Sequence, residues 1–269
     1  EDMVLTITHN QYIKRTSVST YKSQRRGGRG VQGQTAREED FTEHLFVENT
    51  HSYILFFTDK GKCYWVKVYD IPEGGRAAKG RAIVNLIGCE PDEKVSAFIG
   101  VKQDQFHDDH FVVMATEKGI VKKTKLSAYS NPRKKGIYAV EIREGDSLIE
   151  ARVSNGENDI LLGTTNGKSI RFSEEQIRPS GRKTMGVKGI TLSSSDDKVV
   201  GMLLIKREGT VLVATENGFG KRTEIIQYRA QKRGGKGVLT MKTTDKIGKM
   251  ITIKEVVGTD DLIIIRDDG

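Results

Sequence analysis

The chain has 269 residues, and its 44 Lys and Arg against 36 Asp and Glu give a formal net charge of +8 at pH 7. With 36% hydrophobic and 30% charged residues it has the composition of a folded globular protein, and no run approaches the roughly 20 apolar residues of a membrane helix, so we expect no membrane partner. The two cysteines, Cys63 and Cys89, cannot form a four-cysteine metal site, and residues 1–10 show no signal peptide, so a reduced cytoplasmic protein is expected.

A short turn motif recurs along the chain, each time after an apolar run. It reads Thr-x-x-Gly in four copies, with weaker copies at both ends of the chain. In runs such as 53–57 the apolar residues lack the three-and-four spacing of a helix face, so these runs are predicted to be strands. Because glycine tolerates the positive φ of a tight turn, each motif is predicted to be the tip of a β-hairpin. The six turn residues are Gln11, Gly61, Gly119, Gly167, Gly218 and Gly269.

Two further features follow the first five turn residues at near-constant offsets. A large side chain stands ten residues later, and a glycine preceded by Lys or Arg stands 17 to 22 residues later. These positions are Tyr21, Ile71, Tyr129, Ile177 and Tyr228, and Gly30, Gly80, Gly136, Gly189 and Gly237. The pattern indicates duplication of a unit of about 50 residues, which has room for four strands.

The repeat predicts an all-β, propeller-like radial array in a single domain over 1–269. The expected units are 1–50, 51–106, 107–156, 157–206, 207–257 and a partial sixth, 258–269. Because the sixth unit stops at its own hairpin tip, we expect six blades, the last of them incomplete in this chain.

Positive charge is concentrated in the half of each unit that follows the turn residue. The five half-units together hold 96 residues with 28 basic and 5 acidic side chains, a charge of +23, whereas the other 173 residues carry −15. Equivalent positions of a radial repeat lie at equivalent places around a disc, so a basic rim is predicted. Such a rim favours a long polyanion whose phosphates dominate the affinity. The half-units are 12–30, 62–80, 120–136, 168–189 and 219–237.

The most specific motif ends the first half-unit, Gln24-Arg25-Arg26-Gly27-Gly28-Arg29-Gly30. Glycine lets the backbone approach a phosphate closely, and arginine can bind one in a bidentate manner. The fifth unit holds a similar stretch, Gln231-Lys232-Arg233-Gly234-Gly235-Lys236-Gly237. It is either a second phosphate-binding loop or only the ancestral loop of the repeat, and the sequence leaves both interpretations open.

The first heptapeptide resembles the signature box of bacterial DNA gyrase A, Gln-basic-Arg-Gly-Gly-basic-Gly, and the repeats resemble its C-terminal DNA-wrapping domain, a six-bladed β-pinwheel. The resemblance covers nearly the whole chain. It implies a domain that wraps double-stranded DNA around its perimeter and so allows negative supercoiling during ATP-dependent strand passage. It also implies the remainder of gyrase A and the gyrase B polypeptide as partners in an A2B2 enzyme of the bacterial cytoplasm and nucleoid.

In this family the box of the first blade is the functional one, so the resemblance assigns 24–30 as the anchor, with 231–237 as a hypothetical second loop. Basic residues of the other half-units are expected to continue the DNA path along the rim. They are Lys14, Arg15, Arg76, Lys79, Lys122, Lys123, Arg133, Lys134, Lys135, Arg171, Arg182, Lys183, Lys188, Lys221 and Arg222.

No catalytic centre is visible in the sequence. The family's cleavage tyrosine follows an arginine, and none of the eight tyrosines here does. We therefore expect a non-catalytic part of a type IIA topoisomerase, with no metal or cofactor of its own, and with ATP and Mg²⁺ used elsewhere in the enzyme. Trp65 takes the place of a basic residue of the repeat and is expected to pack rather than bind.

Two alternatives remain open. One is a domain of the topoisomerase IV type, which binds and bends DNA without full wrapping, although in that relative the box is degenerate or missing. The other is a protein-interaction propeller, which would not need a basic rim.

Overall fold

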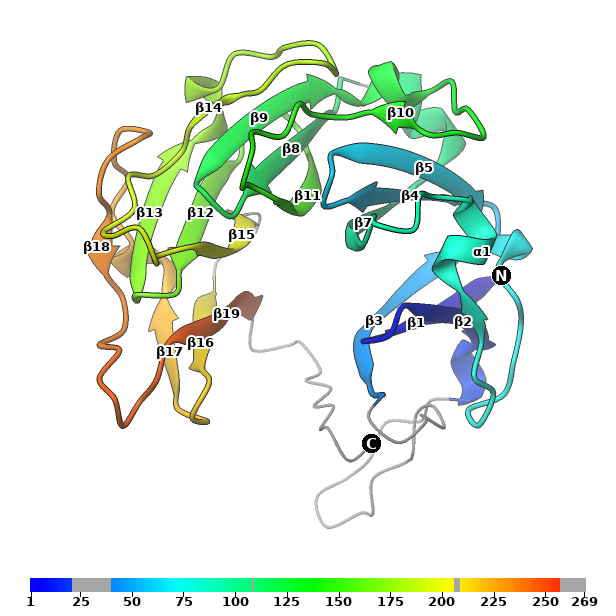
Figure 1. The fold of residues 1–269 in the computed structure, drawn as a ribbon, viewed down its shortest axis with the longest axis horizontal. Coiled ribbons are helices and arrows are strands. Elements are labelled where there is room, and N and C mark those ends of the chain that lie inside the picture. Colours follow the sequence, from blue (N-terminus) through cyan, green and yellow to red (C-terminus); the bar gives the residue numbers. More distant parts are fainter. Residues whose placement is uncertain (21–39, 108, 206–208, 257–269) are drawn as a thin grey trace.

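The computed structural model describes residues 1–20, 40–107, 109–205 and 209–256, which form five antiparallel sheets, here called blades 1 to 5, around an arc (Figure 1). The strands are β1 (Asp2–Thr8), β2 (Tyr12–Ser17), β3 (Thr42–Asn49), β4 (Tyr53–Thr58), β5 (Lys62–Lys67), β6 (Arg81–Ala82), β7 (Val95–Val101), β8 (Phe111–Thr116), β9 (Ile120–Lys125), β10 (Ile137–Tyr138), β11 (Leu148–Ser154), β12 (Asp159–Thr164), β13 (Lys168–Ser173), β14 (Val187–Lys188), β15 (Val199–Ile205), β16 (Thr210–Thr215), β17 (Gly220–Glu224), β18 (Val238–Leu239) and β19 (Met250–Val256). The helices are α1 (Ile83–Ile87) and the 3-10 turns η1 (Val18–Thr20), η2 (Val68–Asp70), η3 (Gln103–His107), η4 (Leu126–Tyr129), η5 (Glu174–Gln176) and η6 (Ile225–Gln227).

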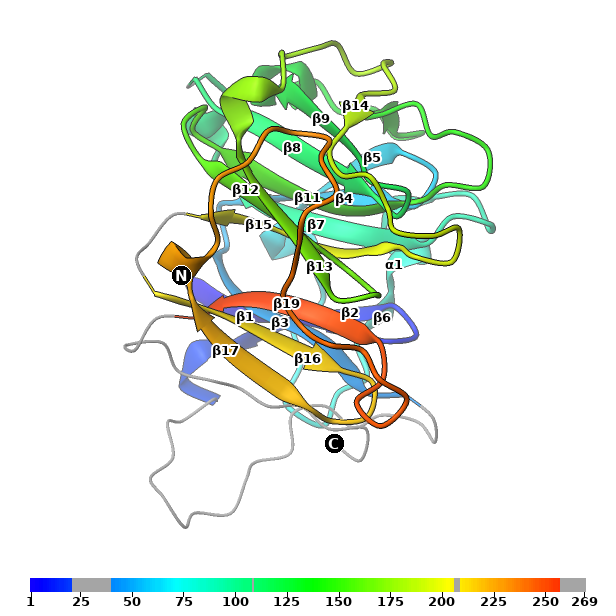
Figure 2. The same cartoon turned by 90° about the vertical axis from the view of Figure 1, so that its left-hand side faces the viewer.

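Each of the first four blades borrows its outer strand from the next repeat unit. Blade 1 has the order β3-β1-β2-β6, and the same order recurs as β7-β4-β5-β10, β11-β8-β9-β14 and β15-β12-β13-β18. Strands β3, β7, β11, β15 and β19 lie toward the centre of the arc, and the borrowed strands β10, β14 and β18 lie outside (Figure 1). Figure 2 shows the segment after β17 leaving blade 5 and crossing over to blade 4. A unit of sequence is therefore not a unit of structure.

The predicted hairpin tips are confirmed at Gln11, Gly61, Gly119, Gly167 and Gly218, whereas Gly269 lies outside the described residues. Gly61 has a φ of 85°, and its amide donates to the carbonyl of Thr58, three residues earlier. The same bond recurs at the other described turn residues. At the first tip Gln11 adopts the conformation with a φ of 63°, the one positive φ among the non-glycine residues that the structure describes.

The hydrophobic core lies between the blades rather than within them. In β4, Ile54 and Phe56 belong to the cluster that blade 2 shares with blade 1, whereas Leu55 and Phe57 belong to the cluster shared with blade 3. Both faces of the central strands are thus covered, which explains why these strands read as continuous apolar runs. Ile71, Tyr129, Ile177 and Tyr228, the large side chains of the repeat, are buried in these clusters.

The expectation of six blades needs correction, because the described residues form five. Blade 5 holds three strands there, in the order β17-β16-β19. The partial unit 258–269 lies outside the described residues. In the part of the chain that is described, none of the helices has the length and apolar character needed to cross a bilayer.

Candidate nucleic-acid interface

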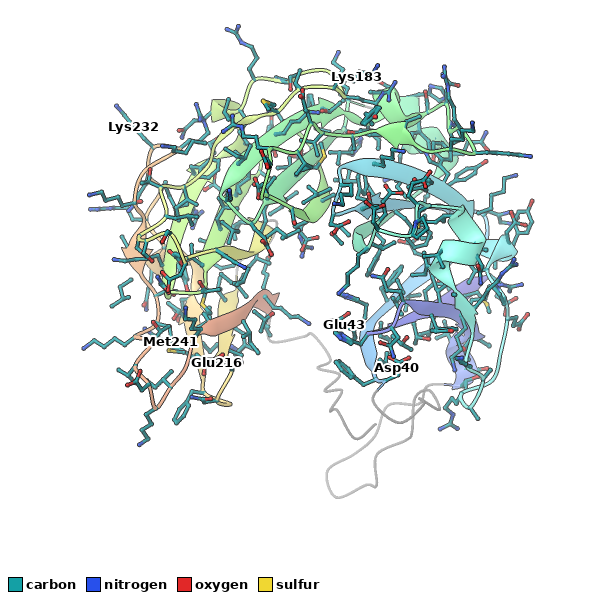
Figure 3. The ribbon with its side chains drawn as sticks, viewed as in Figure 1. Asp40, Glu43, Lys183, Glu216, Lys232 and Met241 are labelled. Carbon is teal, nitrogen blue, oxygen red and sulfur yellow. The ribbon has the colours of Figure 1, made fainter. Side chains whose placement is uncertain are left out.

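Each borrowed strand is reached through a loop that passes from one blade to the preceding one. We call these segments the crossing loops; they are residues 72–80, 130–136, 178–186 and 229–237. They lie on the outside of the arc, where Lys183 and Lys232 point away from the protein (Figure 3). A crossing loop therefore places the basic half of each unit on the perimeter.

Many of the predicted rim residues have exposed side chains on or just after these loops. They are Arg133, Lys134, Lys135, Lys183, Lys188, Lys232 and Lys236, while Arg76, Lys79 and Arg182 are half-buried. The Lys79 ammonium lies 4.1 Å from the ring centroid of Tyr12, on blade 1, so a cation–π contact accompanies that crossing. Four successive blades thus present cations at equivalent places.

Other predicted rim residues face inward instead. Lys14 is 0% exposed, and its ammonium donates to the carbonyls of Gly75, Arg76 and Ala78 at 2.7–2.9 Å. Burial lowers the pKa of Lys14 to about 8. A buried ammonium needs such partners, because desolvation is costly without them. Lys14 thus holds the crossing loop 72–80 from beneath and offers no surface to a phosphate.

Lys122 and Lys123 of β9 are likewise buried, at 1% and 4% exposure. The Lys123 ammonium lies 3.6 Å from a carboxylate oxygen of Glu174, which is 0% exposed, and donates to the Glu174 carbonyl at 3.0 Å. Glu174 belongs to η5 of the following unit, so this ion pair joins blades 3 and 4. The expectation that Lys14, Lys122 and Lys123 line the rim is at odds with this burial.

The position after the inward lysine makes the contact with the next 3-10 turn. Arg15 donates to the carbonyl of Ile71 at 2.7 Å and pairs with Glu73 at 3.4 Å. Arg171 donates to Asp159 at 2.8 Å and to the carbonyl of Ile225 at 3.0 Å. Both arginines therefore already have partners that join neighbouring units.

Trp65 occupies the same position in blade 2 and packs there as predicted. Its ring stacks on Phe106 of η3, with centroids 4.7 Å apart and an angle of 8° between the planes. In blade 5, Lys221 and Arg222 are exposed on β17; Lys221 donates to the Thr240 carbonyl at 3.2 Å, and Arg222 donates to the Thr210 hydroxyl.

The box-like loop 231–237 carries basic side chains that face the protein and others that face the solvent. The Arg233 guanidinium donates to the carbonyl of Gln176 at 3.0 Å and to that of Lys188 at 2.7 Å, and so points back onto residues of unit 4. The amide of Gln231 donates to the Arg171 carbonyl at 2.7 Å, and that of Gly234 to the Gly189 carbonyl at 2.9 Å. Lys232 and Lys236 remain exposed. The first box, 24–30, lies outside the described residues.

The comparisons with known proteins agree with this architecture. The family described as "DNA gyrase C-terminal domain, beta-propeller" matches in five segments, residues 2–47, 52–101, 110–155, 158–206 and 209–256. The chain belongs to this family. A gyrase relative, the DNA gyrase A polypeptide of Staphylococcus aureus (strain NCTC 8325 / PS 47), is 46% identical over 271 residues, which cover 100% of this chain. The chain spans 30% of the length of that relative.

Two solved structures resemble this member of the gyrase C-terminal domain family over 95% of its chain. One is the C-terminal domain of DNA topoisomerase IV, with a TM-score of 0.75, 26% identity and 78% of that chain covered. The other is the DNA gyrase A C-terminal domain, with a TM-score of 0.79, 24% identity and 83% covered. The second likeness is one of fold alone.

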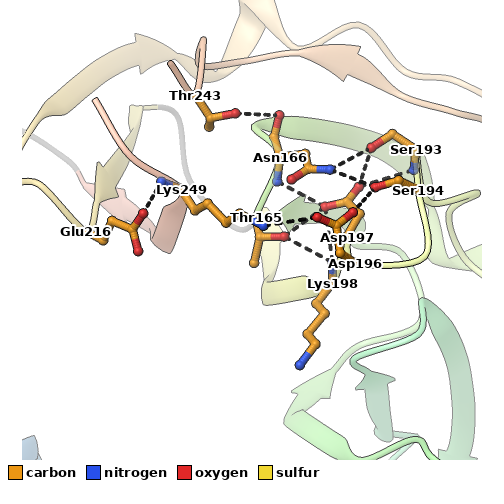
Figure 4. A network of polar contacts seen from close by, with 10 residues as sticks. All are labelled: Thr165, Asn166, Ser193, Ser194, Asp196, Asp197, Lys198, Glu216, Thr243 and Lys249. Carbon is orange, nitrogen blue, oxygen red and sulfur yellow. Dashed lines mark hydrogen bonds and ion pairs between the residues drawn. The ribbon is translucent and has the colours of Figure 1, made fainter. Parts of the chain in front are cut away.

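One repeated feature of this gyrase-family chain escaped the sequence analysis. An acidic residue stands two positions before each of the strands β3, β7, β11 and β15, at Asp40, Glu93, Asp146 and Asp197. Asp197 is 2% exposed and accepts hydrogen bonds from the Thr165 hydroxyl and the Asn166 amide at 3.0 Å (Figure 4). Its recurrence 27 to 32 residues past each turn residue is the signal that could have revealed it.

These acids tie the hairpin tips to the strands that follow. The Asn10 amide donates to Asp40 and the Lys118 amide to Asp146, both at 3.0 Å. Burial raises the pKa of Asp197, but hydrogen bonds from Asn166 and Ser193 outweigh it and lower the pKa overall. These four acidic residues therefore have a structural role. Among the described residues, no three His, Cys, Asp or Glu side chains gather as a metal site would require.

Proposed function

We propose that this chain binds double-stranded DNA along the outside of the arc and wraps it with a fixed hand. The observation that carries the proposal is the repeated crossing loop, which presents cations such as Lys134, Lys183 and Lys232 at equivalent places on successive blades. A duplex following these loops must curve with the arc.

Recognition in this proposal is directed at phosphates and is largely independent of base sequence, because phosphate contacts position a protein on DNA without carrying sequence information. Bending a site of 20–30 bp by 40–90° costs on the order of 1–6 kcal/mol. Only outward cations can offset that cost, so the inward Lys14, Arg15, Lys122, Lys123 and Arg171 are left out of the proposed contacts.

The anchor of the proposed wrap is the first box, with Arg25, Arg26 and Arg29 as its cations. This assignment rests on the resemblance of 24–30 to the gyrase box. The loop 231–237 is proposed as a second contact through Lys232 and Lys236, which are the outward cations of that loop.

The wider role follows from the gyrase relatives. In this proposal the domain has no catalytic site and works with the remainder of gyrase A and with the gyrase B polypeptide, in the bacterial cytoplasm. There it would present a crossing of fixed hand, so that ATP-dependent strand passage introduces negative supercoils. ATP and Mg²⁺ would bind elsewhere in that enzyme.

A second candidate is a domain of the topoisomerase IV type that bends DNA without full wrapping. The likeness to the topoisomerase IV C-terminal domain, at 26% identity, favours it. The intact box at 24–30 favours the wrapping domain instead. The fold alone does not separate these two candidates.

The deciding experiment is topological. The chain is bound to nicked circular DNA, the nick is sealed, and the linking number is measured against protein concentration. Wrapping predicts a shift of consistent sign that disappears when Arg25, Arg26 and Arg29 are changed to alanine. Binding that stays salt-sensitive but produces no shift would contradict wrapping and support the second candidate.

A further inference from the structure

Lys122 lies where the chain that follows the borrowed strand β10 meets the crossing loop 178–186. Its ammonium donates to the carbonyl of Ala139 at 2.5 Å and to that of Arg182 at 2.7 Å. Ala139 directly follows the borrowed strand β10, where unit 3 returns from blade 2, and Arg182 lies in the crossing loop 178–186 of unit 4. One buried cation therefore bridges two segments of successive units, 136–141 and 182–187, which we call the crossing segments of units 3 and 4.

The same two segments also touch directly. The Arg182 guanidinium donates to the Tyr138 carbonyl at 3.0 Å, and the Glu141 amide donates to the Thr184 carbonyl at 3.0 Å. The Lys183 ammonium lies 5.8 Å from the centroid of the Tyr138 ring. Lys122 bonds to both segments from the inner side of this contact. The exposed cations of the crossing loops 130–136 and 178–186 lie on the outer side.

The position of Lys122 recurs in every unit, three residues after the turn residue. It is filled by Lys14, Tyr64, Lys122, Ile170 and Lys221. Tyr64 lies against the crossing loop 130–136, because a Cβ added to Gly136 would be 2.7 Å from the Tyr64 ring. Lys14 holds the crossing loop 72–80 by three hydrogen bonds. The residue at this position therefore supports a crossing loop both as a tyrosine and as a lysine. Lys14 and Lys122 donate to backbone carbonyls of the crossing chain, whereas the Tyr64 hydroxyl donates to the carboxylate of Glu93 at 2.7 Å.

We propose that Lys122 is a positioning residue that joins the crossing segments of units 3 and 4 and so keeps Arg133, Lys134, Lys135 and Lys183 on one path for the DNA backbone. The hydrogen bonds of Lys122 to the two segments do not depend on DNA, whereas the role of aligning these cations for DNA rests on the proposed function. Lys122 does not contact a phosphate in this arrangement, because its ammonium is enclosed by carbonyl oxygens.

The test compares Lys122→Met with Lys125→Met in the 269-residue chain. Lys125 is exposed at the end of the same strand, so both variants lose one charge from β9. Lys122→Ile serves as a second variant, because blade 4 already carries Ile170 at this position. Amide hydrogen exchange of the protein alone, the salt dependence of DNA binding and the linking-number shift are measured for each.

The proposal predicts that exchange in 136–141 and 182–187 becomes about tenfold faster in both Lys122 variants, with β16 unaffected. The slope of log affinity against log salt should stay unchanged, since no phosphate contact is lost, while the linking-number shift per bound protein falls by about half or more. Lys125→Met should leave the exchange as in the unaltered chain.

Two results would overturn the proposal. One is unchanged exchange in the two crossing segments. The other is a slope shallower by about 0.9, the value expected when one phosphate contact is lost. If the unaltered chain itself gave no linking-number shift, the wrapping proposal would fail, while hydrogen exchange would still decide whether Lys122 joins the loops.

Discussion

The crossing loop 229–237 carries cations that differ in direction rather than in charge. Lys232 and Lys236 are exposed, whereas the guanidinium of Arg233 is held by the carbonyls of Gln176 and Lys188. A phosphate can recruit the exposed ammonium groups without breaking any contact within the protein. Arg233 would first have to break its hydrogen bonds to these two carbonyls of unit 4, so its role is to hold the loop.

We expect the double change Lys232→Ala with Lys236→Ala to reduce the slope of log affinity against log salt by about 1.8, because two phosphate contacts are lost at about 0.9 each. Arg233→Ala should leave the slope nearly unchanged. Lys246→Ala, an exposed lysine of the same unit outside the loop, is the charge control. A slope reduced by about 0.9 in Arg233→Ala would show that this arginine contacts DNA directly.

Asp197 shows how a single buried carboxylate organises a hairpin tip. It accepts hydrogen bonds from Thr165, Asn166, Ser193 and Lys198 (Figure 4). An Asn in its place would present an amide NH₂ where one of these donors points. Asp197→Asn is therefore expected to destabilise the fold by about 1–3 kcal/mol at pH 7, measured by denaturant unfolding.

The effect of Asp197→Asn should also depend on pH. The pKa of Asp197 is lowered in the folded protein, so the carboxylate stabilises the fold above about pH 4, the ordinary range of an aspartate, and that stabilisation is lost as pH falls. The difference between the variant and the unaltered chain should shrink between about pH 5 and pH 2. Asp196→Asn, at the exposed neighbouring residue, should change stability by no more than about 0.5 kcal/mol.

Among the structural elements, the hairpin tips combine a shared backbone geometry with different surroundings. Gly61 and Gly218 have φ values of 85° and 83°. A Cβ on Gly61 would lie 2.3 Å from the carbonyl oxygen of Val140, which follows the borrowed strand of blade 2. A Cβ on Gly218 would meet nothing within 4 Å. Gly61 is therefore required for two reasons: its positive φ and the close approach of the segment that follows the borrowed strand.

We expect Gly218→Ala to cost about 1–2 kcal/mol of stability through its left-handed backbone alone. Gly61→Ala should cost a further 1–3 kcal/mol or so, because the Val140 carbonyl must also move. Denaturant unfolding of both variants gives the comparison. Equal costs at the two tips would mean that the borrowed segment does not constrain blade 2.

For the whole molecule, stability depends on contacts between blades, because the apolar clusters lie between them. The Lys123–Glu174 pair sits in one such boundary, where Glu174 also accepts from the Ser154 hydroxyl at 2.8 Å and the Asn158 amide at 2.9 Å. The pair therefore links blade 3 to unit 4 inside the array rather than on its surface.

Glu174→Ala should destabilise the protein by about 3–5 kcal/mol, because it leaves the Lys123 ammonium buried without its counter-charge. Hydrogen exchange should accelerate first in β9, β11 and β12, on both sides of that boundary. Glu175→Ala, one residue along and exposed, provides the matched comparison and should cost no more than about 0.5 kcal/mol. Acceleration spread evenly over all five blades would argue against a local boundary.

The sequence by itself determined the repeat, the hairpin tips, the all-β class and the family. These features can be predicted from short stretches of sequence, because a β-branched run, a turn glycine or a box of seven residues is recognisable without knowledge of the rest of the fold. The large buried side chains, such as Tyr129, and the packing of Trp65 could be predicted for the same reason. The sequence predicted six blades with the last incomplete in this chain, whereas the described residues form five.

Only the tertiary structure decided which basic residues face the solvent. Lys122 and Lys123 belong to the same basic pattern as Lys134 and Lys135, yet the first two are buried and the last two are exposed. Their directions depend on the exchange of strands between units, which brings the Lys122 ammonium to the carbonyl of Arg182, 60 residues away. Charge alone cannot distinguish the two sets, because a lysine can donate to an internal carbonyl as readily as to a phosphate.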